Sequence, residues 1–327
     1  MEALTKKSAP PAMVVLAFAT VYLVWGSTYF FIQRAVQHIP PMLLGALRFS
    51  ASGILLMAWC IIRGEKIFTW QQIKPAAITG LLLLFIGTGI VIWVEKTLPS
   101  SLVAVLLSSQ PLWFIVLDKR HWKDNFKSRN IVIGLIIGFA GVILLFSEEA
   151  ATALSTSKGS LQVTSFLILL LGAISWCSGS LYSKYNSKGP AIVSSSWQML
   201  AAGIAFIPAI FIDNEWSGFA WSTVTTGAWL SVLYLVFMGS LAAYSAYVWL
   251  LSVRPATQVS THAYVNPVVA VLLGAIFASE HISLLQIAGL ATILLSVLLI
   301  NIAKYRNEKP IEQVQHTDLE LRNAERA

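Results

Sequence analysis

The sequence predicts an all-α integral membrane protein with ten transmembrane helices arranged as two inverted five-helix repeats. Three observations lead to this fold class: the composition, the apolar runs, and a weak match between the two halves of the chain. Of the 327 residues, 57% are hydrophobic and 11% are charged, whereas about 25% of the residues in a soluble domain are charged. A chain so poor in charge is typical of a protein embedded in a lipid bilayer.

Ten apolar runs approach the length of about 20 residues that a helix needs to cross a membrane. Gly, Pro or clusters of charge separate these runs, which cover residues 13–34, 41–62, 74–94, 99–117, 129–147, 162–183, 191–212, 225–252, 256–277 and 284–303. The loops between the runs are short, so no soluble catalytic domain fits among them. The first run is too long for a signal peptide, and we expect it to be a membrane span.

The basic residues predict the orientation, because Lys and Arg in short loops remain on the cytoplasmic side. With the N-terminus inside, 18 of the 22 basic residues fall in cytoplasmic segments, and the opposite side holds Arg34, Lys96 and Lys158. We therefore expect a multi-pass protein of the cell (inner) membrane with both termini in the cytoplasm. The net charge of +7 is explained by these loops and by the lipid bilayer beside them, so no nucleic-acid partner is expected.

The two halves match in order at offsets of 150 to 156 residues. Each half has a tryptophan six residues before a proline. A second proline follows twelve residues after the first and is directly preceded by an amide side chain. The matched residues are Trp25 with Trp176, Gly53 with Gly203, Trp93-Pro99 with Trp249-Pro255, and Gln110-Pro111 with Asn266-Pro267. Since five helices per half is an odd number, the second half enters from the opposite face. The predicted repeats are 13–147 (helices 1–5) and 162–303 (helices 6–10), with a cytoplasmic tail at 304–327.

Polar and aromatic side chains within the apolar runs predict a central cavity. Proline frees a backbone carbonyl that lipid cannot satisfy, so the expected kinks at Pro111 and Pro267 should face protein or a wet cavity. Gln258, His262 and Asn266 recur every four residues, which places them on one helix face. The predicted substrate-binding residues are Trp25, Ser27, Tyr29, Trp93, Gln110, Trp113, Trp176, Ser178, Tyr244, Tyr247, His262 and Asn266. These neutral groups suit a small amphipathic or zwitterionic solute.

Structural roles remain open for these residues. The polar side chains at 110, 262 and 266 could simply bond neighbouring helices, and the tryptophans could pack or lie at the membrane interface. Arg48 lies near the outer end of the second run, where it could reach the interface or anchor a substrate carboxylate. Glu280 is expected to make a helix-end or loop interaction.

Three stretches carry a resemblance to a known family. They are "NPVVAVLLGAIFASEHISLLQIAGLATILLSVLLI" (266–300), "VWGSTYFFIQRAV" (24–36) and "PPMLLGALRFSASGILL" (40–56). They resemble the last two helices, the first helix and the second helix of the EamA family in the drug/metabolite transporter superfamily, with Arg48 on the family's arginine. The resemblance implies two EamA repeats, alternating access around a central cavity, and export of small metabolites such as amino acids. The first repeat departs from the pattern, with Asp118 or Asp124 in the region that corresponds to Glu280.

Other functional classes lack support in the sequence. It contains no H-E-x-x-H, no G-x-S-x-G and no acidic pair within a span, and its cysteines fit neither a disulfide framework nor a metal site. We therefore expect no enzyme, metal or cofactor. The expected function is a secondary transporter that exports a small-molecule substrate, such as an amino acid or similar amphipathic solute. The alternative is a small-solute channel or facilitator without coupled export. Proton coupling, if present, would run through His262, because no carboxylate lies deep in a span.

Overall fold

The computed structural model describes residues 9–98, 103, 106–145, 147, 159–277 and 283–307, and all regular structure in these ranges is helical. The first half contains α1 (Pro11–Val36), α2 (Pro41–Ile62), α3 (Trp70–Gly80), η1 (Leu81–Thr88), α4 (Gly89–Val94), α6 (Gln110–Leu117), η2 (Lys119–His121), α7 (Trp122–Lys127) and α8 (Arg129–Leu145). The second half contains α10 (Gly159–Asn186), α11 (Ala191–Ile212), η3 (Trp221–Thr223), α12 (Thr226–Tyr234), η4 (Leu235–Tyr244), α13 (Ser245–Val253), α14 (Ala256–Val259), α15 (His262–Phe277) and α16 (Leu284–Asn307).

Eight of the ten predicted runs correspond to apolar helices. Within the described residues, six helices are long and apolar enough to cross a membrane, at Pro11–Val36, Pro41–Ile62, Trp70–Val94, Leu167–Asn186, Ala191–Ile212 and Thr226–Val253. Two shorter apolar helices cover Arg129–Leu145 and Leu284–Ile300. The run 256–277 is divided by a turn between α14 and α15, and the run 99–117 is described only from 106 onward apart from residue 103. Ten membrane-crossing helices therefore remain a prediction, and Pro99 and Glu280 lie outside the described residues.

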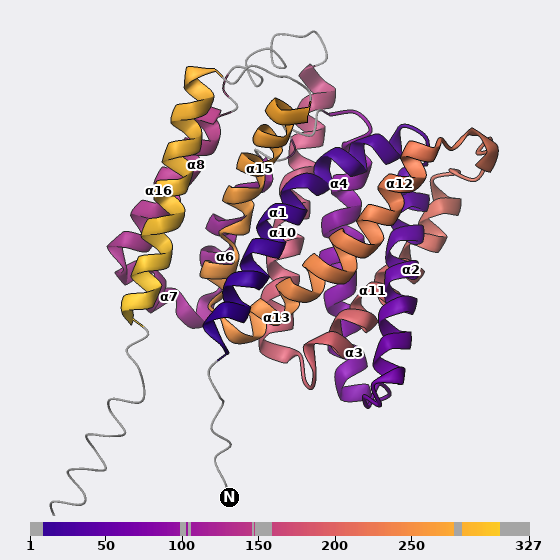
Figure 1. Ribbon diagram of the computed structural model, residues 1–327, viewed down its shortest axis with the longest axis horizontal. Helices are drawn as coiled ribbons and strands as arrows, with labels where there is room; N and C mark the ends of the chain where they lie inside the picture. The colour runs from indigo at the N-terminus through magenta and orange to yellow at the C-terminus, as the bar shows by residue number, and fades with distance from the viewer. Residues whose placement is uncertain are drawn as a thin grey trace, which may run out of the picture.

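The helices stand side by side in one bundle, and α1 begins at the end of the bundle where α16 finishes (Figure 1). Within the bundle, α1 packs against both α15 and α12, while α8 and α16 pack together at one edge. Large apolar side chains such as Leu16, Ile62, Ile204 and Phe211 are exposed on the outer faces of their helices. Such a surface suits contact with lipid rather than water.

The long helices α2 and α11 end with the same backbone motif. After α2, the amide of Gly64 donates to the Ile61 carbonyl and that of Glu65 donates to the Cys60 carbonyl. The chain can make these bonds because Gly64 adopts a positive φ of 72°, the left-handed conformation that closes a helix in this way. After α11, the two residues that follow Asp213 make the equivalent bonds, with a φ of 52° at the first of them.

Helices α2 and α11 also cross at small residues. A Cβ atom added to Gly53 would lie 2.8 Å from the backbone nitrogen of Leu200, and one added to Gly203 would lie 2.7 Å from the backbone nitrogen of Ser50. Any larger residue at either position would force the two backbones apart. The contact is reciprocal, because each glycine meets the residue three positions before the other.

Two π-helical segments, η1 and η4, interrupt the middle of two long helices. A π turn displaces backbone carbonyls from their usual partners and often marks a functional region. Here the hydroxyl of Ser175 donates to the Leu82 carbonyl at 2.8 Å, and the indole nitrogen of Trp25 donates to the Gly239 carbonyl at 3.1 Å. Each π segment is thus held by a side chain from a different helix, α10 or α1.

Candidate functional site

A cavity lies among α1, α2, α10, α15 and the two π segments. It contains about 670 Å³ of space not filled by atoms, including its open side. Seven predicted binding residues lie on its wall, namely Trp25, Tyr29, Gln110, Trp176, Tyr244, His262 and Asn266. The π segments contribute Leu84, Gly87 and Thr88 from η1 and Gly239 and Tyr244 from η4. Residues far apart in the sequence therefore meet at one site.

The other predicted binding residues do not line this cavity. Tyr247 lies directly behind the wall, with its ring centroid 4.9 Å from that of Trp25. Ser27 is buried and shares a hydrogen bond of 2.6 Å with the Tyr234 hydroxyl. Trp93 is 40% exposed, and Trp113 and Ser178 are half-buried.

The two prolines expected to cause kinks occupy different positions in their helices. Pro111 lies in the first turn of α6, immediately after a turn at Ser108 and Ser109. Proline is well tolerated there, because the first amides of a helix have no partner within it. Pro267 instead lies inside α15, where it removes a backbone donor one position after the cavity residue Asn266.

An aromatic cluster forms one side of the cavity. The ring of Trp25 meets those of Trp176 and His262 edge to face, at centroid distances of 5.4 Å and 5.0 Å. The indole nitrogen of Trp176 donates to the Tyr247 hydroxyl at 3.1 Å, and that hydroxyl bonds Ser180 at 2.7 Å. The rings are therefore fixed in place, and they offer an apolar surface with negative ring faces to a ligand.

Three buried polar atoms on the wall have no hydrogen-bond partner among the described residues: Gln110 Oε1, His262 Nε2 and Asn266 Oδ1. The Asn266 amide nitrogen lies 3.4 Å from His262 Nδ1. Since that amide nitrogen can only donate, Nδ1 accepts, and in the neutral ring Nε2 carries the hydrogen. These three neutral atoms thus offer one free donor and two free acceptors. Leaving such groups unpaired costs about 1–3 kcal/mol each, so they favour a polar ligand.

Two charged residues accompany these neutral groups. Arg48 lies on the cavity wall and is 5% exposed. Its Nε donates to the Ser240 hydroxyl at 2.9 Å, so its head group points into the protein and not toward the outer interface. Glu95 follows α4 and is 3% exposed. Its carboxyl interacts electrostatically with Arg48 and with the wall residue Tyr29.

Arg48 could be recognised in the sequence as an anchor for a substrate carboxylate, whereas Glu95 was not predicted. Glu95 follows the apolar run 74–94 directly, so it reads as the first residue of an exposed loop. One signal in the sequence does single it out: in the internal match, Leu251 occupies the position that corresponds to Glu95. A charge that replaces an apolar residue at a matched position next to a membrane span is a candidate functional group.

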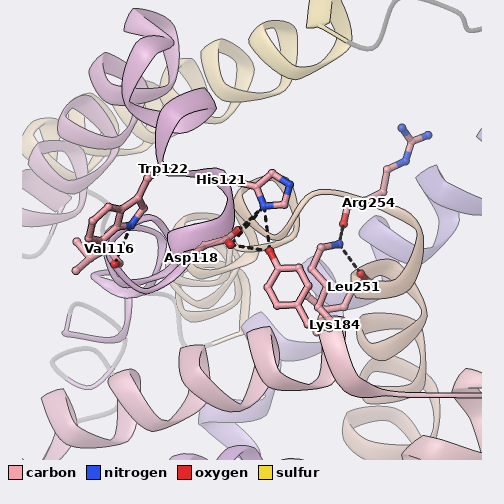
Figure 2. A network of polar contacts seen from close by, with 8 residues as sticks. Val116, Asp118, His121, Trp122, Lys184, Leu251 and Arg254 are labelled. Carbon is pink, nitrogen blue, oxygen red and sulfur yellow. Dashed lines mark hydrogen bonds and ion pairs between the residues drawn. The ribbon is translucent and has the colours of Figure 1, made fainter.

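A second polar cluster lies where α6 ends, apart from the cavity (Figure 2). The Tyr185 hydroxyl donates to Asp118 Oδ1 at 2.6 Å, and His121 Nδ1 lies 3.3 Å from the same carboxyl group. Nearby, Lys184 Nζ donates to the carbonyls of Leu251 at 2.8 Å and Arg254 at 2.6 Å. The cluster joins the end of α6 to α10, and Lys184 satisfies carbonyls at the end of α13. It therefore connects the first half of the chain to the second.

Within the described ranges, no group of three His, Cys, Asp or Glu side chains could hold a metal ion. The cavity wall instead combines aromatic and aliphatic side chains with amides, hydroxyls, an imidazole and a guanidinium. Such groups bind solutes through hydrogen bonds and charge.

Comparisons with known proteins agree with this description. The model of the EamA-like transporter family matches residues 12–147 and 163–302. The chain is 35% identical over 294 residues to the inner membrane transporter YedA of Escherichia coli strain K12, covering 88% of the chain and 90% of that relative. It is 24% identical over 302 residues to a probable amino-acid metabolite efflux pump of Salmonella typhimurium, covering 88% and 93%.

A solved crystal structure has the same fold, with a TM-score of 0.72 at 19% sequence identity. The match covers 92% of this chain and all of the other.

Proposed function

Because the chain belongs to the EamA-like transporter family, we propose that it exports a small metabolite, an amino acid or a similar amphipathic solute, across the inner membrane. The observation that carries this proposal is the cavity, which combines fixed aromatic rings with unpaired buried donors and acceptors. Amphipathic solutes offer an apolar part to the rings and polar groups to the amides and imidazole. The name of the Salmonella relative, a probable amino-acid metabolite efflux pump, supports the same substrate class.

We assign the substrate contacts to the seven predicted residues on the wall. Trp25, Trp176 and Tyr244 supply the aromatic surface, while Gln110, His262 and Asn266 supply hydrogen bonds and Tyr29 supplies both. The fixed rings require little ordering when a solute binds, which favours affinity. The remaining predicted residues are assigned to packing around the cavity.

We further propose that the chain has ten membrane helices in two inverted repeats, 13–147 and 162–303. The family model matches residues 12–147 and 163–302, and these ranges nearly coincide with the two proposed repeats. The π segments η1 and η4 begin 154 residues apart, close to the offset of the internal match. In Figure 1, α3 and α13 lie at one end of the bundle and α4 and α12 at the other, so these two helical runs point in opposite directions. The reciprocal crossing of α2 and α11 supports the same symmetry.

In this scheme the substrate passes by alternating access. The cluster at Asp118, His121 and Tyr185 joins the two halves at the end of the bundle where α1 begins. The distribution of basic residues assigns this end, and both termini, to the cytoplasm. Opening that end requires these bonds to break, while the cavity residues remain in place. Transport is driven by exchange or by the substrate gradient, or is coupled to protons through His262.

The experiment that tests the function is an unbiased metabolite profile of cells that overexpress the protein. We expect at least one amino acid or similar metabolite to fall inside the cells and rise in the medium, relative to cells that express the Asn266→Leu variant at equal level. A profile without any extruded species, together with a ligand-gated current, would replace this proposal with a channel.

A further inference from the structure

Two opposite charges stand beside the cavity without touching. Arg48 comes from α2 and Glu95 from the turn after α4, and both are nearly inaccessible to solvent. Each Glu95 oxygen lacks a hydrogen-bond partner among the described residues. Arg48 Nε donates to the Ser240 hydroxyl, so the two terminal nitrogens of the guanidinium remain able to donate to another acceptor. The two groups attract each other, but each presents an unsatisfied polar face.

This arrangement differs from that of a structural ion pair. Burying two charges costs more than their attraction returns unless hydrogen bonds satisfy both groups. A pair kept for stability would therefore be expected in direct contact, with the carboxylate oxygens on the guanidinium nitrogens. Here the residues that flank the charges, Tyr29 and Gly239, belong to the cavity wall. Arg48 itself lines the cavity, and Glu95 follows the wall residue Val91 by one helical turn, with its amide donating to the Val91 carbonyl. Both charges therefore lie next to the space where a ligand would bind.

Arg48 and Glu95 also correspond to uncharged residues in the second half of the chain. At an offset of 150 residues, Arg48 corresponds to Gln198, and at an offset of 156, Glu95 corresponds to Leu251. Gln198 is buried and neutral, and its side chain accepts a hydrogen bond of 2.5 Å from Tyr244 and donates one of 2.8 Å to Ser194. The second half of the protein therefore has a neutral, hydrogen-bonded Gln198 at the position where the first half has the charged Arg48. The symmetric packing of the repeats does not require these charges.

We propose that Arg48 and Glu95 together select zwitterionic solutes, with the guanidinium binding the carboxylate of the solute and the Glu95 carboxylate binding its ammonium group. This inference rests on the proposed function of the cavity and specifies how it reads charge. A zwitterion satisfies both protein charges at once. A solute with one charge leaves the other protein group buried and unpaired, and such a group carries a desolvation cost.

The test compares matched ligands on matched variants. The purified full-length protein in lipid nanodiscs is titrated with the common amino acids, and the tightest is compared with analogues that lack its carboxylate or its ammonium group. For phenylalanine these are 2-phenylethylamine and 3-phenylpropanoate. The variants are Glu95→Gln and Arg48→Gln. The controls are Glu215→Gln and Arg34→Gln, which remove the same charges outside the cavity wall.

The parent should bind the amino acid at least about tenfold more tightly than either analogue, the factor expected for one lost charge-assisted hydrogen bond. Glu95→Gln should weaken the amino acid by about tenfold and strengthen the carboxylate-only analogue, because Arg48 then lacks a competing anion. Arg48→Gln should strengthen the amine-only analogue instead. Both controls should keep the ranking of the parent.

Two results would overturn the inference, and they are distinguishable. If the parent binds an amino acid but Glu95→Gln keeps the parental ranking of the three ligands, the charges do not select the solute and the proposed function stands. If the parent binds none of the amino acids, the proposed function fails and the inference fails with it. If Arg48→Gln does not fold, the inference is decided by Glu95→Gln alone, through the increase in affinity for the carboxylate-only analogue.

Discussion

Replacing Asn266 by leucine separates a binding role from a packing role on the cavity wall. The Asn266 side chain is 3% exposed, and its Oδ1 has no partner among the described residues. Its amide nitrogen makes a long contact of 3.4 Å with His262, and the side chain also interacts with the Tyr29 hydroxyl. Leucine has the same number of side-chain heavy atoms and the same branching, and it removes both polar atoms. The protein therefore loses little hydrogen bonding within its own structure, about 1 kcal/mol or less.

Transport should suffer more than folding. If Asn266 Oδ1 accepts a hydrogen bond from the substrate, its loss leaves a substrate donor unpaired in the cavity, at a cost of about 1–3 kcal/mol. This corresponds to a loss of roughly 5- to 150-fold in transport efficiency. The assay is uptake of the identified substrate into proteoliposomes, normalised to folded protein measured by size-exclusion chromatography. Asn130→Leu, which removes an exposed amide from the first turn of α8, is the matched control.

Equal transport per folded molecule in Asn266→Leu and the parent would refute this reasoning. A large loss of folded protein without a change in specific transport would also refute it, and would show that the residue acts in packing.

Three further variants test other parts of the account. Trp25→Phe keeps an aromatic ring but removes the donor to the Gly239 carbonyl of η4. We expect a loss of about 1 kcal/mol in unfolding free energy and weaker substrate binding. Unchanged thermal stability would contradict the role of this bond in holding η4. Tyr185→Phe removes the 2.6 Å bond to the buried Asp118 carboxylate. Stability should fall by about 1–3 kcal/mol, and thermal denaturation equal to that of the parent would show that this bond does not hold α6 to α10. Glu215→Ala removes the carboxylate that accepts hydrogen bonds from the first amides of α2 at 2.9 and 3.0 Å. Thermal denaturation should reveal a loss of about 1 kcal/mol in unfolding free energy. A variant as stable as the parent would show that water caps α2 equally well.

The helices could be predicted from the sequence wherever apolar length decides the structure. The run 41–62 coincides with α2, because Pro41 starts the helix and Gly64 closes it. The run 256–277 was expected to be one helix but turns near its start. There the hydroxyls of Ser260 and Thr261 donate to backbone carbonyls three positions earlier, and such local bonds compete with the helical pattern. The π segments could not be foreseen, since an apolar stretch fits α and π turns equally well.

The site was predictable where a polar group interrupts an apolar run. Gln110 and Asn266 have no favourable contact with lipid, and both lie on the cavity wall. Tryptophan was a weaker guide, because it packs, lines cavities or lies at the membrane interface with similar ease. Trp25 lines the cavity, whereas Trp93 is 40% exposed and lies outside the wall. Glu95 was missed because burial at the end of a helix depends on the neighbouring helices, which the local sequence does not specify.

Counterflow in proteoliposomes tests the central claim, substrate export by alternating access, most directly. Vesicles that contain the purified protein are loaded with an unlabelled amino acid identified by the metabolite profile and diluted into a trace of the labelled form. We predict that labelled substrate accumulates transiently above its external concentration, because a carrier that returns loaded exchanges one molecule for another. Simple equilibration of the label without an overshoot, accompanied by a substrate-gated current, would contradict the account and identify the protein as a channel.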